Sequence, residues 1–243
     1  GGGNRSMGSN ITINGGTVTA NGGENASGIG EGENGKDIGA ISVATTLIVK
    51  AGSTENPTDV ITNTGADLAS SLKGKRYVII ESKPVSVAYI DENGAEQTAS
   101  AYVVADASTQ VTLGTIGETS WYVVNGADVQ LTKGAVCNGD VRLILADGAK
   151  LTATGWYDEE EYDGYAGIQV SGEVNSLSVY GQAAQTGQLI AQGSKDCAGI
   201  GSEKGVCVYN ITINGGNITA TGGGSGAGIG SGHKTHCYNI TIN

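Results

Sequence analysis

Apolar and polar residues alternate over short runs of this chain, and the same runs return at a fixed spacing. The sequence Asn-Ile-Thr-Ile-Asn occurs at residues 10–14, 210–214 and 239–243. Asn210 and Asn239 are 29 residues apart, and so are the two Gly-Ile-Gly sequences that begin at Gly199 and Gly228. Two independent landmarks give one period, so the chain is predicted to be a stacked repeat protein with repeats of about 29 residues.

Each repeat predicts short strands joined at glycine corners. In Ile211-Thr-Ile213 and Ile218-Thr-Ala220 every second residue is apolar, which is the pattern of a strand with one buried face. Gly215-Gly216 and Gly222-Gly223 can adopt positive φ angles at the corners. Three such strands cannot close a core alone, so successive repeats must stack in parallel, about 4.8 Å apart. The sequence therefore predicts an all-β fold, a right-handed parallel β-helix or solenoid.

Strand alternation also predicts which side chains face the core and which face solvent. The inward set is Ile11, Ile13, Val18, Ile29, Leu177, Val179, Ile200, Ile211, Ile213, Ile218, Ile229, Ile240 and Ile242, and the outward set is Thr12, Thr19, Thr212 and Thr219. At the corners, equivalent asparagines should stack, Asn210 on Asn239 and Asn214 on Asn243, giving ladders of side-chain amides.

Weaker copies of the repeat extend from about Trp121 to the C-terminal end of the sequence. Leu143–Leu145 and Leu177–Val179 align with Ile211–Ile213, and Tyr122–Val124 aligns as an earlier copy. Nearer the N-terminus, residues 10–30 form one good repeat and residues 40–49 a decaying one, whereas residues 50–77 depart from the pattern. One array of repeats therefore ends before a second array begins.

Composition narrows the class of protein. The 243 residues include 42 Gly and no Phe, and the formal net charge is −11. A 38% hydrophobic content is enough for the thin core of a solenoid, so the chain is not predicted to be disordered. The acidic balance argues against nucleic acid and anionic membranes as partners. The sequence contains no apolar run of about 18 residues, so no membrane insertion is expected within this segment.

Both ends of the sequence fall inside a repeat, which predicts a segment of a longer protein. The open start and the open end share the Asn-Ile-Thr-Ile-Asn sequence. Exposed strand edges of this kind can pair with another chain. We therefore expect self-association through the open end repeats, head to tail, as a route to a filament.

The clearest candidate binding segment is an acidic and aromatic insertion at residues 156–165. It interrupts one repeat at a corner, and insertions of this kind gather on one face of a solenoid. The candidate ligand-binding residues are Trp156, Tyr157, Asp158, Tyr162, Asp163 and Tyr165. Aromatic rings can stack on a sugar while carboxylates accept its hydroxyls or bind calcium. The alternative is a solvated acidic loop whose tyrosines pack on the neighbouring repeat.

The cysteines and histidines give weaker signals. Cys207 and Cys237 lie one period plus one residue apart and could form a disulfide, although small buried thiols are the alternative. His233, His236 and Cys237 could hold a metal, but the acidic or further thiolate ligands that would complete a site are missing. We therefore predict no metal site and no cofactor apart from calcium at the acidic insertion.

Catalysis has little support in the sequence. β-Helices that cleave polysaccharides need clustered aspartates with a lysine or arginine on one outer face. Here the outward strand positions are mostly Thr, Ser, Asn, Gln and Lys. No catalytic residue is predicted, and the protein is not expected to be an enzyme.

Several runs together resemble the Gly-rich β-helix repeats of large bacterial surface proteins, many from gut anaerobes and often labelled carbohydrate-binding. These runs are Trp121–Gly126, Val141–Gly148, Leu151–Ala153, Ser176–Gln182, Ala198–Gly201 and Asn210–Gly216. The resemblance implies an extracellular or cell-surface location and a structural and adhesive role. The alternative is a carbohydrate-binding module that uses the insertion at residues 156–165 to bind a polysaccharide or a cell-surface glycan.

The same resemblance implies two half-helices. In that family, Tyr-Val-Val and Leu-Ile-Leu-Ala-Asp-Gly repeats open a helix, and a segment similar to Leu47–Gly52 through Tyr77–Ile80 closes one. Residues 1–82 are therefore expected to be the C-terminal part of one β-helix, and residues 83–243 a cap segment and the N-terminal part of a second. Within that cap, Asp91-Glu-Asn-Gly94 predicts a β-hairpin turn.

Overall fold

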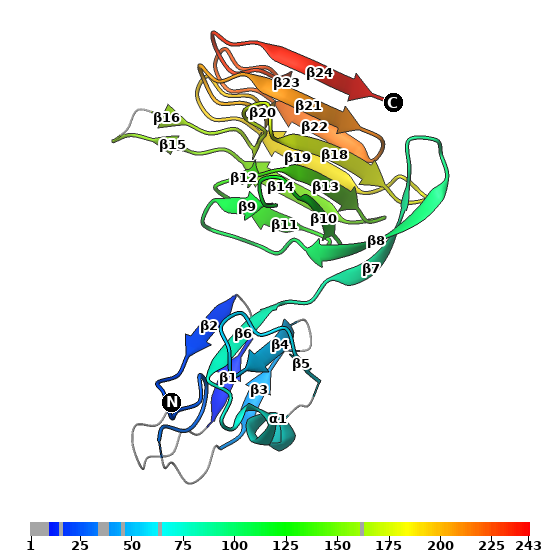
Figure 1. The fold of residues 1–243 in the computed structure, drawn as a ribbon. Helices are drawn as coiled ribbons and strands as arrows, with labels where there is room; N and C mark the ends of the chain where they lie inside the picture. The colour runs from blue at the N-terminus through cyan, green and yellow to red at the C-terminus, as the bar shows by residue number, and fades with distance from the viewer. Residues whose placement is uncertain (1–9, 15–16, 34–38, 45–46, 63–64, 161–162) are drawn as a thin grey trace. The chain divides into compact units, whose positions relative to one another are not determined.

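The computed structural model describes residues 10–14, 17–33, 39–44, 47–62, 65–160 and 163–243. The chain forms two compact units, residues 1–83 and residues 84–243. Among the described residues one helix is accompanied by 24 strands, so the predicted all-β class is confirmed (Figure 1).

In the second unit, strands from successive repeats stack into three sheets. The first sheet has the order β24 (Cys237–Ile242), β21 (Val208–Ile213), β18 (Ser176–Gly181), β13 (Asp140–Leu145), β10 (Thr119–Val124), β8 (Glu96–Val103) and β7 (Val85–Ile90). The second has the order β11 (Val129–Leu131), β14 (Lys150–Thr154), β19 (Gln188–Gln192) and β22 (Asn217–Thr221). The third has the order β23 (Ile229–Gly230), β20 (Ile200–Gly201), β17 (Ile168–Gln169), β12 (Ala135–Cys137) and β9 (Val111–Leu113).

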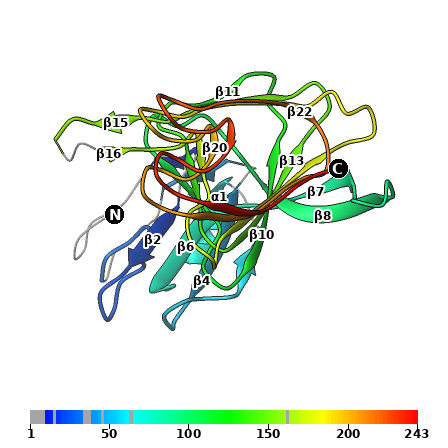
Figure 2. The ribbon, with the colours of Figure 1, turned by 90° about the horizontal axis from the view of Figure 1, so that it is seen from above.

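The predicted alignment of the repeats is confirmed by the strand pairing. Leu177 pairs with Ile211 in the first sheet, Leu189 with Ile218 in the second, and Ile200 with Ile229 in the third, all in parallel. The chain visits the three sheets in turn and then returns to the first, one repeat further along (Figures 1 and 2). This is the parallel arrangement of a β-helix repeat.

The inward strand positions make the core of each unit, and in the second unit they come from all three sheets. Of the predicted inward set, Ile29, Leu177, Val179, Ile200, Ile211 and Ile213 are buried, and Ile11, Ile13, Val18, Ile218, Ile229 and Ile240 are partly buried against a core. The predicted outward Thr12, Thr19 and Thr219 are exposed, whereas Thr212 is half-buried. Ile242 pairs with Ile213 and so keeps the inward register, but it is 67% exposed because β24 is the last strand of its sheet and no further strand covers it.

The predicted amide ladders are confirmed at the corners of the first sheet. The Asn239 side-chain amide donates to the Oδ1 atom of Asn210 at 3.0 Å, and Asn243 donates to the Oδ1 atom of Asn214 at 2.7 Å. Asn210 and Asn239 both have a φ of 55°. Asparagine tolerates this left-handed conformation better than most residues, which explains why the repeat begins with it.

Strands β7 and β8 form the predicted hairpin, and the Asp91 carboxylate organises its turn. The Oδ1 atom accepts hydrogen bonds from the backbone N–H groups of Asn93 at 3.0 Å and Ala95 at 2.8 Å. Gly94 supplies a φ of +77°. Strand β8 pairs in parallel with β10, so the hairpin extends the first sheet at the end opposite β24.

The hairpin also covers part of the outer face of the first sheet. A second cluster of buried residues lies there, separate from the inner core, and it consists of Ala99, Ala101, Val123, Ile144 and Tyr180, with Val85, Val87, Tyr89, Trp121 and Ala146 packed against them. Both faces of β10 and β13 are therefore buried. The continuous apolar runs of these strands reflect that double burial.

The first unit departs from the predicted stacking. Strands β1 (Ile11–Ile13) and β3 (Ile41–Val43) pair in parallel as two repeats should. However, β2 (Val18–Asn21) and β4 (Leu47–Gly52) do not pair with each other, because β6 (Tyr77–Ser82) lies between them and is antiparallel to both. The order of this sheet is β2-β6-β4-β5, with β5 at Val60–Ile61.

A short helix, α1 (Gly65–Leu72), completes the core of the first unit. Leu68 and Leu72 are fully buried beside Ile41. They are four residues apart and so lie on one face of the helix. The sequence pattern of residues 50–77 did not predict this element, because a single i, i+4 pair is a weak helical signal.

Asp147 links two consecutive repeats of the second unit and should make the stability of the fold depend on pH. Its carboxylate accepts hydrogen bonds from the backbone N–H groups of Ala184 at 2.9 Å and Thr186 at 3.1 Å. These bonds lower the pKa of Asp147 below its ordinary value of 3.8. Because the pKa is lower in the folded state, the ionised carboxylate stabilises the fold. This contribution to the free energy of unfolding is complete above pH 3.8 and is lost as the pH falls through the folded-state pKa.

We therefore expect Asp147→Asn to reduce the stability of the protein at neutral pH and to have less effect near pH 2. Chemical denaturation at several pH values measures this difference. The Glu159→Gln variant is a control, because Glu159 is exposed on a different loop. A deficit for Asp147→Asn that stayed constant from neutral pH to about pH 2 would contradict the role assigned to the ionised carboxylate.

Candidate functional site

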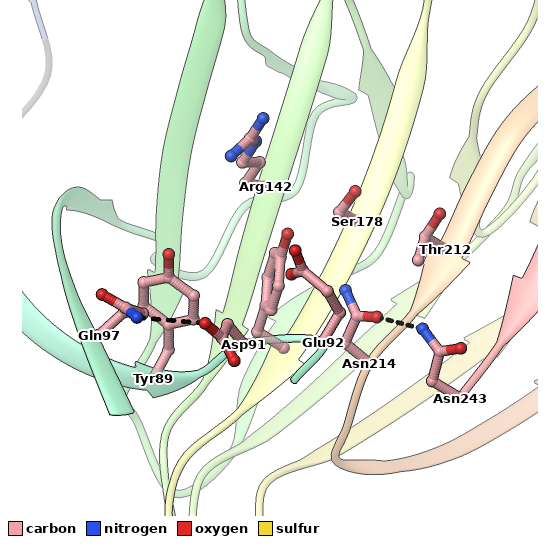
Figure 3. A pocket seen from close by; sticks show the side chains of 10 residues that line it. Tyr89, Asp91, Glu92, Gln97, Arg142, Ser178, Thr212, Asn214 and Asn243 are labelled. Atoms are coloured by element: carbon pink, nitrogen blue, oxygen red, sulfur yellow. Dashed lines mark hydrogen bonds between the residues drawn. The ribbon is translucent and has the colours of Figure 1, made fainter. Parts of the chain in front are cut away.

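A pocket opens between the tip of the β7–β8 hairpin and the outer face of the first sheet (Figure 3). Its volume is about 400 Å³. We call it the hairpin pocket, and it is lined by Tyr89, Asp91, Glu92, Gln97, Arg142, Ser178, Tyr180, Thr212, Asn214 and Asn243. These residues come from the one β7–β8 hairpin and from four consecutive strands of the first sheet or the positions that directly follow them, so the site exists only when the repeats are stacked and the hairpin is docked.

The hairpin contributes an aromatic ring and two carboxylates. The ring centroid of Tyr89 lies 4.7 Å from that of Trp121 and 4.9 Å from that of Tyr180. Burial raises the pKa of the Tyr89 hydroxyl, and the proximity of Tyr180, Asp91 and Glu92 raises it further. Tyr89 is therefore a neutral hydroxyl at neutral pH, held in place by its aromatic neighbours.

Asp91 is oriented by its own hairpin. In addition to its turn hydrogen bonds, its Oδ2 atom accepts from the side-chain amide of Gln97 at 3.1 Å (Figure 3). The backbone N–H of Ala95 is the largest cause of the lowered pKa of Asp91, so its carboxylate stays ionised. Asp91 and Gln97 are thus fixed groups at the mouth of the pocket.

The sheet contributes a positively charged group with a fixed direction. The Nε and Nη2 atoms of Arg142 each lie 3.1 Å from the Oδ2 atom of Asp140, and the guanidinium lies over the Trp121 ring at 5.2 Å. Burial alone would raise the pKa of Asp140, but hydrogen bonds from Thr119, Ser176 and Arg142 outweigh it and lower the pKa. Asp140 is therefore ionised and holds the guanidinium against the sheet.

Further along the same outer face, the lining becomes uncharged and polar. Ser178 and Thr212 occupy neighbouring positions in the paired strands β18 and β21. Asn214 and Asn243 follow at the corner and are joined by the amide ladder (Figure 3). The outer face thus changes from apolar under the hairpin to hydroxyl and amide groups beyond its tip.

The insertion predicted as the binding segment forms a second, smaller hairpin. Strands β15 (Tyr157–Asp158) and β16 (Asp163–Gly164) are antiparallel and project beside the sheets in Figure 1. Tyr162 lies outside the described residues. The described candidates are brought near one another, since Tyr157 pairs with Gly164 and Asp158 pairs with Asp163.

The aromatic rings of this hairpin contact one another and two lysines from other loops. Trp156 and Tyr165 are parallel within 7°, with ring centroids 4.7 Å apart. The Nζ atom of Lys133 lies 4.2 Å from the centroid of the Trp156 ring, and that of Lys195 lies 5.5 Å from the Tyr157 ring. Such contacts hold a hairpin in place, and they leave less ring surface for a ligand.

The cysteines are all free thiols in the structure. Cys207 and Cys237, which the sequence suggested as a disulfide, are not bonded. The physical reason is the register, because Cys237 pairs with Val208, which places it one position away from Cys207, the residue just before β21. Burial raises the pKa of Cys137 to about 12, and the hydroxyl of Thr235 donates to Cys207 and lowers the pKa of that thiol.

Within the described residues, no group of three or more His, Cys, Asp or Glu side chains is arranged to hold a metal ion. This finding includes His233, His236 and Cys237. In the same residues, no helix is long and apolar enough to cross a membrane.

Sequence reasoning missed the residues of the hairpin pocket. They are polar, widely separated in the chain and ordinary in composition. One signal was present: Trp121–Val124 and Leu143–Leu145 are apolar without alternation, which indicates strands buried on both faces. That signal predicts a cover over the outer face, but it does not predict which segment supplies the cover.

Two segments of the chain, residues 11–30 and residues 211–233, match the family described as Beta helix repeat. No curated protein and no solved structure matches the chain. The matched segments begin at Ile11 and Ile211, which occupy the same position in the repeat and begin or lie within β1 and β21. The match supports a parallel β-helix repeat in each of the two units.

Proposed function

We propose that residues 84–243 form a right-handed parallel β-helix, and that residues 1–83 are the closing part of another. The parallel pairing of all three sheets from β10 onward supports the first part. Parallel crossover connections are right-handed in nearly all proteins, which supports the handedness. The inserted strand β6 and helix α1 interrupt the stacking in the first unit and support its role as an end.

On this basis, the chain is a structural and adhesive element of an extracellular, cell-surface protein of bacteria, with no catalytic role. The observation that carries this proposal is the continuous stack of β13, β18, β21 and β24, in which neighbouring strands pair in register and the outer face bears polar side chains beyond the hairpin tip. Such a stack is a stiff spacer that presents side chains at regular intervals. Such a spacer suits a surface protein that extends away from its own cell and attaches that cell to another surface.

A display experiment tests the adhesive role. Residues 1–243 would be exported and anchored on a non-adherent bacterium, and attachment of the cells to epithelial monolayers and to mucin would be counted. The control is the same display of a variant with Leu143 and Leu177 both replaced by aspartate, which cannot keep a folded core. Attachment above this control supports the proposal, and equal attachment of both strains contradicts it.

The proposal includes self-association through the exposed strand β24. Tyr238 and Ile242 are 47% and 67% exposed on this strand, and its outer edge has no partner among the described residues. Unpaired edges with exposed apolar side chains promote pairing with another chain. We expect Ile242→Lys to reduce the mass measured by light scattering at high protein concentration, and a monomeric mass for the unaltered protein would contradict this part of the proposal.

The second candidate function is a carbohydrate-binding module that uses the hairpin at residues 156–165. The observation in its favour is the parallel Trp156–Tyr165 pair beside the carboxylates of Asp158 and Asp163. Calcium could join those carboxylates to sugar hydroxyls. Electrophoresis through gels that contain neutral or acidic polysaccharide, with and without calcium, should show retardation that is lost when residues 158–163 are replaced by Gly-Gly.

A further inference from the structure

We infer that the hairpin pocket binds a neutral, polyhydroxylated ligand, namely a sugar unit of a glycan. The inference deepens the adhesive function proposed above and rests on it for its biological role. It assigns the contact to the β7–β8 hairpin and the outer face of the first sheet, not to the insertion at residues 156–165. The argument begins with the hydrogen-bonding state of the residues that line the pocket.

Tyr180 is the most informative of these residues. It is only 6% exposed, and its ring is packed against Tyr89 and Trp121. It nevertheless lines the pocket, and its hydroxyl forms no hydrogen bond with any described residue. The hydroxyl itself is not among the fully buried atoms that lack a partner, so the buried ring presents an accessible oxygen to the pocket. The open side of this hydroxyl is the pocket, so its partner must be solvent or a ligand there.

Three other polar groups of the lining, one exposed and two half-buried, also lack a partner within the described part of the protein. The Glu92 carboxylate and the hydroxyls of Ser178 and Thr212 form no hydrogen bond or ion pair with the described part of the chain. Figure 3 shows the Glu92 side chain at the hairpin tip, beside the part of the sheet where Ser178 and Asn214 also line the pocket. The pocket therefore offers unpaired acceptors and donors from both of its walls.

The remaining lining groups are already oriented by the protein. Asp140 holds Arg142, Gln97 holds Asp91, and Asn243 holds Asn214. Groups fixed in this way need little ordering when a ligand binds, which reduces the entropic cost of binding. The pocket thus combines an oriented frame with a smaller set of unpaired hydroxyl and carboxylate groups.

The mixture of groups discriminates among ligand classes. An anion would meet the carboxylates of Asp91 and Glu92, and Arg142 is already neutralised by Asp140. A metal ion finds no cluster of three ligating side chains in the described residues. An apolar ligand would cover these polar groups and offer them no hydrogen-bond partner. A sugar hydroxyl both donates and accepts, so it matches tyrosine, serine, threonine and carboxylate partners together.

The size of the pocket is compatible with this class. At about 400 Å³ it lies within the usual range for small-ligand sites, roughly 300 to 1,000 Å³. One wall is the edge of the Tyr89, Trp121 and Tyr180 cluster, where the apolar side of a sugar ring can pack. We therefore expect one or two sugar units to be bound, at the end or within a longer glycan.

Isothermal titration of residues 1–243 with defined sugars tests the inference. The panel would contain glucose, galactose, mannose, N-acetylglucosamine and cellobiose as neutral members and glucuronate as an acidic one. At least one neutral sugar should bind with a Kd below about 1 mM. Tyr180→Phe keeps the packed ring and removes only the hydroxyl, and it should weaken that binding about fivefold to tenfold.

A second variant tests the opposite wall, and a third is a matched control. Glu92→Gln should weaken binding about tenfold, because a charged acceptor is replaced by a neutral one. Glu96→Gln makes the same chemical change on the same hairpin, and Glu96 is exposed like Glu92 but does not line the pocket. Its affinity should therefore equal that of the unaltered protein.

The inference is overturned if no neutral sugar of the panel binds saturably, or if Tyr180→Phe and Glu92→Gln leave the binding unchanged. Tighter binding of glucuronate than of every neutral sugar would also overturn it. These outcomes are distinct from failure of the proposed function. If the cells attach but the soluble protein binds no sugar, only the inference about the pocket is contradicted. If the protein binds a sugar but the cells do not attach, only the adhesive role is contradicted.

Discussion

Replacing Leu143 with alanine is expected to lower the free energy of unfolding of the second unit by about 2 to 5 kcal/mol. Leu143 is fully buried, and its neighbours along the inner face are Tyr122 on one side and Val179 on the other. Removing its branched end leaves a cavity between two repeats, and parallel strands held on both sides have little freedom to collapse into it. Denaturant unfolding followed by the fluorescence of Trp121 and Trp156, both in the second unit, measures the loss.

The same inward column provides a matched control. Val179 pairs with Ile213, and Ile213 pairs with Ile242 on the exposed strand β24. Ile242→Ala removes a similar volume from the same column but from a side chain that is 67% exposed. We expect it to cost less than about 0.5 kcal/mol. Equal costs at Leu143 and Ile242 would mean that the inner column is not a continuous packed core.

Gly201→Ala should be at least as damaging, for a reason that lies in the backbone. Gly201 has a φ of +143°, and a Cβ atom added to it would overlap the carbonyl oxygen of Gly230 in the next repeat. Neither the φ angle nor the close approach can be relieved without separating β20 from β23. The expected cost is about 3 kcal/mol or more, since strain and a backbone clash add, and it appears as a lowered denaturation midpoint.

Gly205→Ala separates these two contributions. Gly205 also has a positive φ, +80°, but a Cβ atom there would meet no other atom within 4 Å. Only the conformational strain remains, so we expect a cost of about 1 to 2 kcal/mol. A cost for Gly201→Ala no greater than this would show that neighbouring repeats can move apart at Gly201 without loss.

The repeat architecture of the second unit could be predicted from the sequence, because its causes are local and periodic. Ile211–Ile213 alternates in polarity, and the distance to its copies in the chain specifies which strands pair. Even the weak copy at Leu177–Val179 pairs in the predicted register. A shift of one residue would turn the inward isoleucines out to solvent. The free-energy cost of exposing them is large, so the register can be predicted from the sequence.

The exceptions arise where a segment outside the periodic pattern enters the stack. Strand β6 separates β2 from β4, although both have the pattern of stacked repeat strands. Tyr77–Ser82 is a generic apolar run, and nothing in it indicates whether it pairs in parallel or antiparallel. Helix α1 was missed for a similar reason, because its burial depends on the neighbouring strand β3 and not on its own short pattern.

The candidate sites show the same division. The insertion at residues 156–165 was found because its aromatic and acidic residues are adjacent in the chain. The hairpin pocket joins Tyr89 and Glu92 to Tyr180 and Asn214, which are brought together only by the fold. The most informative feature of the pocket is the hydroxyl of Tyr180, which has no partner in the described part of the protein. That feature depends on three-dimensional packing and cannot be predicted from composition or residue spacing.

The docking of the β7–β8 hairpin has a consequence for the order in which this protein folds. Each parallel pair of the second unit joins residues about one repeat apart, so the repeats can assemble by successive short loop closures. The side-chain amide of Gln182, in contrast, donates to the carbonyl of Ala88 across 94 residues of sequence. That contact, and the partners of Tyr89 on β10 and β18, become available only after three repeats have stacked. We therefore expect the hairpin to close over the sheet in a late kinetic phase, so that a newly synthesised chain acquires its rigidity first and its pocket last.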